Sequence, residues 1–136
     1  MNLDRFVAAQ APVYTRALAE LTAGRKQSHW MWFVFPQIAG LGKSPMAQHY
    51  AIHSLQEARD YLDHPLLGAR LKECTQAVMN VEERTAHQIF DTPDDLKFHS
   101  SMTLFSRAAP DEPLFCNALD KYFGGKEDAL TLQKLQ

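Results

Sequence analysis

One stripe of apolar residues constrains the fold of this chain more than any other feature. After Pro65, apolar side chains recur at spacings of three and four. An α-helix repeats about every 3.6 residues, so this spacing places them all on one helical face. Charged and polar residues occupy the positions between them. The sequence therefore predicts an amphipathic central helix whose buried face consists of Leu67, Leu71, Cys74, Val78 and Val81.

Residues that begin or end helices stand between further segments of this kind. Ser44 precedes Pro45, which predicts an N-cap followed by the first turn of a helix. Ser54 stands three residues before Glu57, as in a capping box. Gly24 follows an apolar helical pattern and is expected to end that helix. Most of the chain therefore reads as short helices joined by turns.

The length and composition of the chain favour one folded unit. With 136 residues, 46% hydrophobic and 22% charged, it has enough apolar surface for a hydrophobic core and lacks the composition of a disordered protein. We expect residues 1–136 to form a single, mainly α-helical domain. The expected fold class is all-α, a compact bundle of about seven or eight short helices.

Charge and hydropathy exclude several classes of function. A net charge of −2 and a pI near 6.3 argue against nucleic-acid binding through a basic face. No apolar run approaches the length of a membrane span, and the N-terminus lacks the pattern of a signal peptide. Cys74 and Cys116 lie in apolar helical patterns without metal-binding spacing, which predicts reduced core thiols. We expect a cytoplasmic protein that does not contact membranes.

The stretch from Arg25 to Met46 interrupts the helical pattern. It holds both tryptophans beside basic side chains, and Pro36 opens a turn-rich part of it. Cationic groups next to indole rings suit an anionic group attached to a flat ring, as in a nucleotide. The same residues also suit a plain core with solvated loop charges. The candidate ligand-binding residues here are Arg25, Lys26, Trp30, Trp32 and Gln37.

A second candidate face carries Lys97, Ser100 and Ser101, which helical spacing brings together. One positive charge and two hydroxyls could bind a phosphate or a carboxylate. Alternatively, Lys97 pairs with Asp94 and the serines bond back to the preceding helical turn. We include all three residues among the candidate ligand-binding residues, and His29 is the candidate general acid or base should the protein catalyse a reaction.

A metal site is the weakest of the candidates. His49 and His53 are four residues apart, which is a spacing used by metal-binding helices. Tyr50 stands where such a motif would carry glutamate, and Ser54 is expected to begin a new helix between them and Glu57. We therefore predict no metal site and no cofactor.

Three stretches of the sequence closely resemble one bacterial family, which is catalogued as domain of unknown function 1810. They read SHWMWFVFPQIAGLGKSPMAQHYAI from Ser28, HPLLGARLKEC from His64 and DDLKFHSSMTLF from Asp94. The resemblance extends over nearly the whole chain. It implies a compact, mainly α-helical domain without an established activity, and it assigns no catalytic residue.

Two functions remain open at this point. In the first, a small anionic, nucleotide-like metabolite is either bound or both bound and turned over between the block from Arg25 to Gln37 and the face from Lys97 to Ser101. In the second, the protein is a helical interaction module that binds a protein partner through an exposed patch of Trp30, Trp32 and Phe35. The sequence does not give the oligomeric state.

Overall fold

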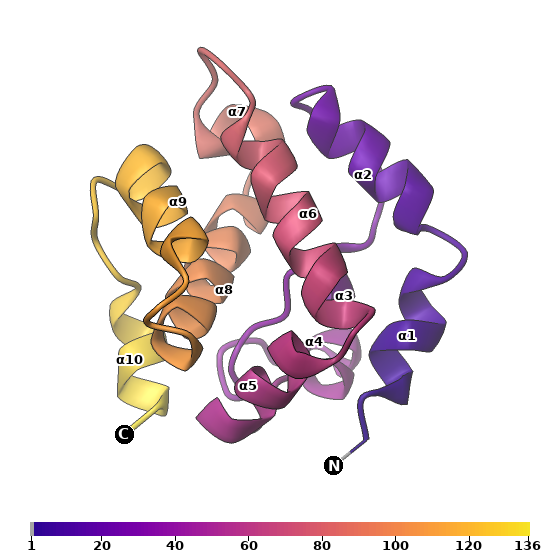
Figure 1. The fold of residues 1–136 in the computed structure, drawn as a ribbon, viewed down its shortest axis with the longest axis vertical. Helices are drawn as coiled ribbons and strands as arrows, with labels where there is room; N and C mark the ends of the chain where they lie inside the picture. Colours follow the sequence, from indigo (N-terminus) through magenta and orange to yellow (C-terminus); the bar gives the residue numbers. More distant parts are fainter. Residues whose placement is uncertain (1) are drawn as a thin grey trace.

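The computed structural model describes residues 2–136, which form ten helices and no strand (Figure 1). The all-α class is thereby confirmed. An isolated parallel bridge joins Ile38 to Ile52. The helices are α1 (Asp4–Gln10), α2 (Tyr14–Thr22), α3 (Met31–Val34), α4 (Pro45–His49), α5 (Leu55–Asp63), α6 (Leu67–Met79), α7 (Ala86–Phe90), α8 (Asp94–Ala108), α9 (Pro113–Phe123) and α10 (Ala129–Lys134).

The number of helices exceeds the seven or eight expected from the sequence. The difference arises from very short helices: α3 has four residues, and α4 and α7 have five each. A helix of one turn has too few positions to show a periodic pattern, so only its cap can mark it in the sequence, as Ser44 marks α4.

The predicted stripe from Leu67 to Val78 forms the buried face of α6, which packs against α2, α5 and α9. Val81, the last predicted member, lies beyond the end of this helix, although it is also buried at 9% exposed. Leu67, Leu71, Cys74 and Val78 are each at most 1% exposed. At the start of this helix, a Cβ atom on Gly68 would lie 2.0 Å from the carbonyl oxygen of Leu62. Only glycine permits such a close approach of α6 to the end of α5.

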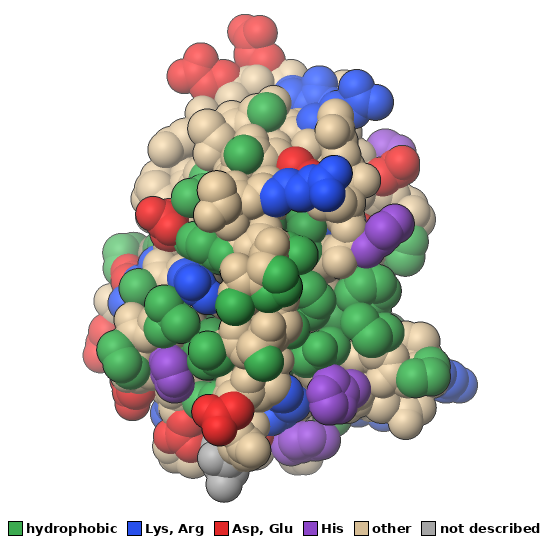
Figure 2. Space-filling model, turned by 90° about the vertical axis from the view of Figure 1, so that its right-hand side faces the viewer, with side chains coloured by type: hydrophobic (Ala, Val, Ile, Leu, Met, Phe, Trp, Pro, Cys, Tyr) green, Lys and Arg blue, Asp and Glu red, His purple; other side chains and the backbone are tan. Residues whose placement is uncertain are grey.

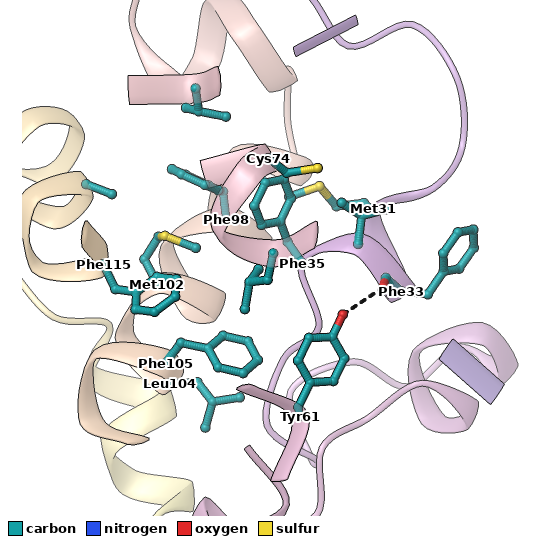
Figure 3. Packing of buried hydrophobic residues seen from close by; sticks show 14 of the residues in the cluster. Met31, Phe33, Phe35, Tyr61, Cys74, Phe98, Met102, Leu104, Phe105 and Phe115 are labelled. Carbon is teal, nitrogen blue, oxygen red and sulfur yellow. Dashed lines mark hydrogen bonds between the residues drawn. The ribbon is translucent and has the colours of Figure 1, made fainter. Parts of the chain in front are cut away.

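Aromatic rings fill the centre of the core (Figure 3). Phe98 on α8 lies among four of them: Phe35 and Phe90 have ring centroids 5.1 and 4.7 Å away, and Tyr122 and Phe123 complete the set. Figure 3 also shows the hydroxyl of Tyr61 donating to the carbonyl oxygen of Phe33 at 3.4 Å. That bond satisfies a polar group inside the core.

The helix ends follow the predicted capping residues. The hydroxyl of Ser44 accepts a hydrogen bond from the amide of Ala47, and that of Ser54 accepts from the amide of Glu57. Gly24 follows α2 with a φ of +76°, which favours glycine. The capping predictions are therefore confirmed at these positions.

The two cysteines differ in their surroundings. Cys74 is buried, as predicted, but Cys116 is exposed, and both are free thiols. The prediction of a core position for Cys116 was wrong, because that residue lies on the solvent side of α9. No helix within residues 2–136 combines the length and apolar character that a membrane crossing requires.

Candidate functional site

A buried carboxylate organises the segment that connects α2 to α3. Glu20 on α2 is 8% exposed, and its Oε1 accepts hydrogen bonds from the amides of Gln27 and Ser28 and from the indole of Trp30, at 2.9 to 3.0 Å. Burial alone would raise the pKa of Glu20, but the hydrogen bonds from Gln27, Ser28 and Trp30 outweigh it and lower the pKa to about 2. An ionised glutamate therefore holds this loop in shape.

The same contact removes Trp30 from the set of ligand-binding candidates. Its side chain is fully buried, and its indole N–H is occupied by Glu20. Phe35 is also fully buried. The exposed patch of Trp30, Trp32 and Phe35 that the interaction module requires is therefore not formed, because two of its three members belong to the core.

Two predicted lysines meet around one carboxylate. Lys26 Nζ lies 2.8 Å from Asp94 Oδ2, and Lys97 Nζ lies 3.7 Å from Asp94 Oδ1. Each ammonium group also lies over an indole ring, Lys26 over Trp30 and Lys97 over Trp32, both 5.1 Å from the ring centroid. The loop before α3 and the start of α8, which lie far apart in the sequence, thus adjoin.

A cavity of about 290 Å³ opens beside Lys97, between the loop after α3, the start of α8 and the last helix, α10. We call it the α8–α10 cavity. It brings together three of the predicted candidates, Gln37, Lys97 and Ser100, with residues that the sequence did not indicate. The residues that line it are Gln37, Leu41, Gly42, Pro93, Leu96, Lys97, Ser100, Asp128 and Leu130.

Some polar groups in this cavity already have hydrogen-bond partners, and others have none. Asp128 Oδ2 accepts hydrogen bonds from the amide and the hydroxyl of Thr131, and the Ser100 hydroxyl lies 3.2 Å from it. Within residues 2–136, by contrast, the side-chain amide of Gln37 forms no hydrogen bond, and neither does the ammonium group of Lys97. Gln37 and Lys97 are therefore the groups with donors to spare for a ligand.

Apolar side chains reach the surface at this cavity. Hydrophobic side chains also lie at the surface elsewhere: Figure 2 shows a different face of the molecule, where they lie among charged ones. In residues 2–136, the large hydrophobic side chains that are most exposed are Leu96 and Leu130, at 58% each, ahead of Met46 and Leu66. Both of the most exposed leucines belong to the α8–α10 cavity.

Two other candidates line a different cavity. Arg25 and Lys26 border a polar hollow of about 590 Å³ between the loop before α3 and the residues around α7. We call it the basic basin. The sequence did not indicate its further cation, Arg84, because that residue lies in a loop without a recognisable motif. The residues that line the basin are Arg25, Lys26, Gln27, Arg84, His87, Gln88, Ile89 and Asp91.

The remaining candidates lie outside both cavities. His29 is exposed, and its ring forms no hydrogen bond within the described residues. Ser101 is fully buried, and its hydroxyl has no hydrogen-bond partner in that part of the chain. Neither residue touches the space where a ligand would lie in the two cavities. Lys97 and Ser100 line the α8–α10 cavity, but His29 does not.

The histidine pair lies outside the continuous helix that its metal-binding spacing would need. α4 ends at His49 and α5 begins only after Ser54, so His49 and His53 do not share a helix. Within residues 2–136, no group of three or more His, Cys, Asp or Glu side chains is placed to hold a metal ion.

Comparisons with known proteins place the chain in a family. The family model described as "Protein of unknown function (DUF1810)" matches residues 1–135. A solved structure, the conserved hypothetical protein Rv1873 from Mycobacterium tuberculosis, is 57% identical, with a TM-score of 0.97 over 98% of this chain and 95% of that chain. No curated protein matches significantly. The chain therefore belongs to the DUF1810 family, whose function is not known.

Proposed function

We propose that this protein binds a small amphipathic anion in the α8–α10 cavity. One observation carries the proposal: Lys97 and Gln37 have unused hydrogen-bond donors in a cavity whose wall also contains three leucines, Leu41, Leu96 and Leu130. Ligand sites are typically apolar hollows with a few polar groups that orient the bound molecule. The anionic group would bind Lys97 and Gln37, and the apolar part would contact Leu96 and Leu130.

The charges in the cavity support an anionic ligand. Lys97 Nζ lies 3.7 Å from the nearer oxygen of Asp94, which is beyond a normal hydrogen bond. Its three N–H donors are therefore available. The other charged group, Asp128, is engaged by Thr131 and Ser100 at the N-terminus of α10. Its negative charge is partly offset by these hydrogen bonds, whereas the charge on Lys97 is offset only at longer range.

The size and lining of the cavity narrow the class of ligand. A volume of about 290 Å³ is at the lower end of the range for ligand sites, and no aromatic side chain lines it. Stacking on a nucleobase therefore has no support, and Trp30 is not part of the proposal. His29 does not line the cavity, so the proposal is of binding and includes no bond-breaking step.

Hexanoate and hexanol provide a direct test by titration calorimetry. They share an apolar chain, but only hexanoate carries an anionic group. We expect hexanoate to bind more tightly than hexanol, and we expect Lys97→Gln to raise the Kd for hexanoate about tenfold or more, since a hydrogen bond to a charged group is lost.

Lys126→Gln is the matched control, because Lys126 is exposed and its ammonium group forms no hydrogen bond or ion pair within residues 2–136. It removes the same charge from the protein and should leave the Kd unchanged. Equal binding of hexanol and hexanoate, or equal loss of affinity in both variants, would contradict the proposal.

A further inference from the structure

We propose that the basic basin is a second binding site, which takes the phosphate group of a small phosphorylated molecule. The basin and the α8–α10 cavity have no lining residue in common. The inference therefore stands apart from the function proposed above, and it concerns Arg25 and Arg84, which line the basin from the loop before α3 and the loop before α7.

Arg84 is held in place by backbone carbonyls of Gly24 and of Gln88 on α7. Its Nε donates to the carbonyl oxygen of Gly24 at 3.0 Å, and its Nη2 donates to that of Gln88 at 2.8 Å. A further backbone bond, from the amide of Lys26 to the carbonyl oxygen of Ile89 at 2.8 Å, joins the two sides of the basin. The guanidinium of Arg84 is thus fixed before any ligand arrives, which lowers the entropic cost of binding.

All N–H groups of the Arg25 guanidinium are available to bind a ligand. Its side chain is exposed and forms no hydrogen bond or ion pair within residues 2–136. An exposed guanidinium without a partner among the described residues and a second one held by the backbone would allow two-point contact with a tetrahedral oxyanion. Arginine suits this role because its planar N–H groups match pairs of phosphate oxygens.

The charge balance in the basin favours an anion. Three basic side chains line it, against the single carboxylate of Asp91. Lys26 is neutralised by Asp94 at 2.8 Å, so the excess positive charge belongs to Arg25 and Arg84. His87, whose ring faces Asp91 at 3.9 Å and Asp95 at 3.5 Å, does not reverse this balance.

The lining of the basic basin also indicates what kind of molecule carries the phosphate group. Ile89 is the only aliphatic side chain among the lining residues, so an apolar ligand would gain little from burial there. The volume of about 590 Å³ exceeds what one phosphate group fills. A phosphate attached to a small polar body therefore fits the basin, whereas the α8–α10 cavity, with three leucines in its lining, suits a more apolar molecule.

Inorganic phosphate and pyrophosphate are the probes for this site. We expect both to raise the Tm of the protein relative to sodium chloride at the same ionic strength, because a ligand of the folded state adds stability by mass action. By titration calorimetry, Arg25→Gln and Arg84→Gln should each weaken pyrophosphate binding about tenfold or more.

Arg59→Gln is the control, since Arg59 is exposed on α5 and its side chain bonds to nothing within residues 2–136. Its pyrophosphate affinity should match that of the unchanged protein. Arg84→Gln also removes two contacts with the backbone, so Arg25→Gln, which removes none, decides the matter. Unchanged affinity in Arg25→Gln, or equal stabilisation by chloride, would overturn the proposal.

Discussion

Replacing Phe98 with alanine is expected to lower the free energy of unfolding by about 3–5 kcal/mol, as is typical for a buried phenylalanine. Phe98 is fully buried, and its ring packs against aromatic side chains from three other parts of the chain: Phe35 in the loop after α3, Phe90 at the end of α7, and Tyr122 and Phe123 on α9. The variant would leave a cavity among rigid rings, which fill such a gap poorly.

Urea denaturation measures this loss, and Leu96→Ala on the same helix provides the comparison. Leu96 is 58% exposed, so its truncation should change stability by no more than about 0.5 kcal/mol. A similar loss in the two variants would show that Phe98 does not hold the core together in the way we describe.

Replacing Glu20 with glutamine is expected to lower the free energy of unfolding by about 3 kcal/mol at neutral pH. Glutamine keeps the size of the side chain but offers only one acceptor oxygen and no charge. Its NH₂ group would face hydrogen-bond donors from the loop, among them the hydroxyl of Ser28, which donates to Oε2 at 2.7 Å. Some of these buried donors would then be left without a partner.

The effect of Glu20 should fade in acid. Its pKa is about 2 in the folded protein, against an ordinary value of 4.5. Because the folded-state pKa is the lower one, the stability that Glu20 contributes is present above about pH 4.5 and is lost as the pH falls toward 2. The gap between the unchanged protein and Glu20→Gln should therefore narrow between these limits.

Urea titrations of both proteins at a series of pH values across this window test the prediction. Glu82→Gln serves as the control, because Glu82 is exposed and its side chain bonds to nothing in residues 2–136. Its stability should follow that of the unchanged protein at every pH. A gap between Glu20→Gln and the unchanged protein that stays constant down to about pH 2 would show that Glu20 is not ionised in the fold.

Local features of the fold could be predicted because they depend on neighbours in the sequence. The buried stripe of α6 follows from helical periodicity, and the caps at Ser44 and Ser54 follow from side chains that bond to amides three residues away. The shape of the segment around Trp30 could not be predicted in this way. It is set by Glu20, ten residues earlier, and a glutamate at the edge of a helical apolar face carries no sign of such a role.

The candidate site likewise combines residues that the sequence indicated with residues that only tertiary packing brings there. Gln37, Lys97 and Ser100 were expected to meet, and they line one cavity. Its remaining wall depends on how α10 docks on α8, where the hydroxyl of Thr103 accepts a hydrogen bond from the amide of Asp128 at 2.9 Å. That contact joins residues 25 positions apart, so no local pattern marks it. Arg84 was missed for a similar reason, since only tertiary packing brings it beside Arg25.

Hydrogen exchange of the α10 amides should report whether a ligand occupies the α8–α10 cavity. This helix has six residues and packs mainly on α8, with Thr131 as its buried contact. Short elements with few buried contacts open locally more often than the core does, so the amides of α10 should exchange with deuterium early. A molecule that bridges Leu130 and Leu96 would have to slow that exchange. Occupancy of the cavity could thus be read by mass spectrometry for any mixture of compounds, before the bound one is identified.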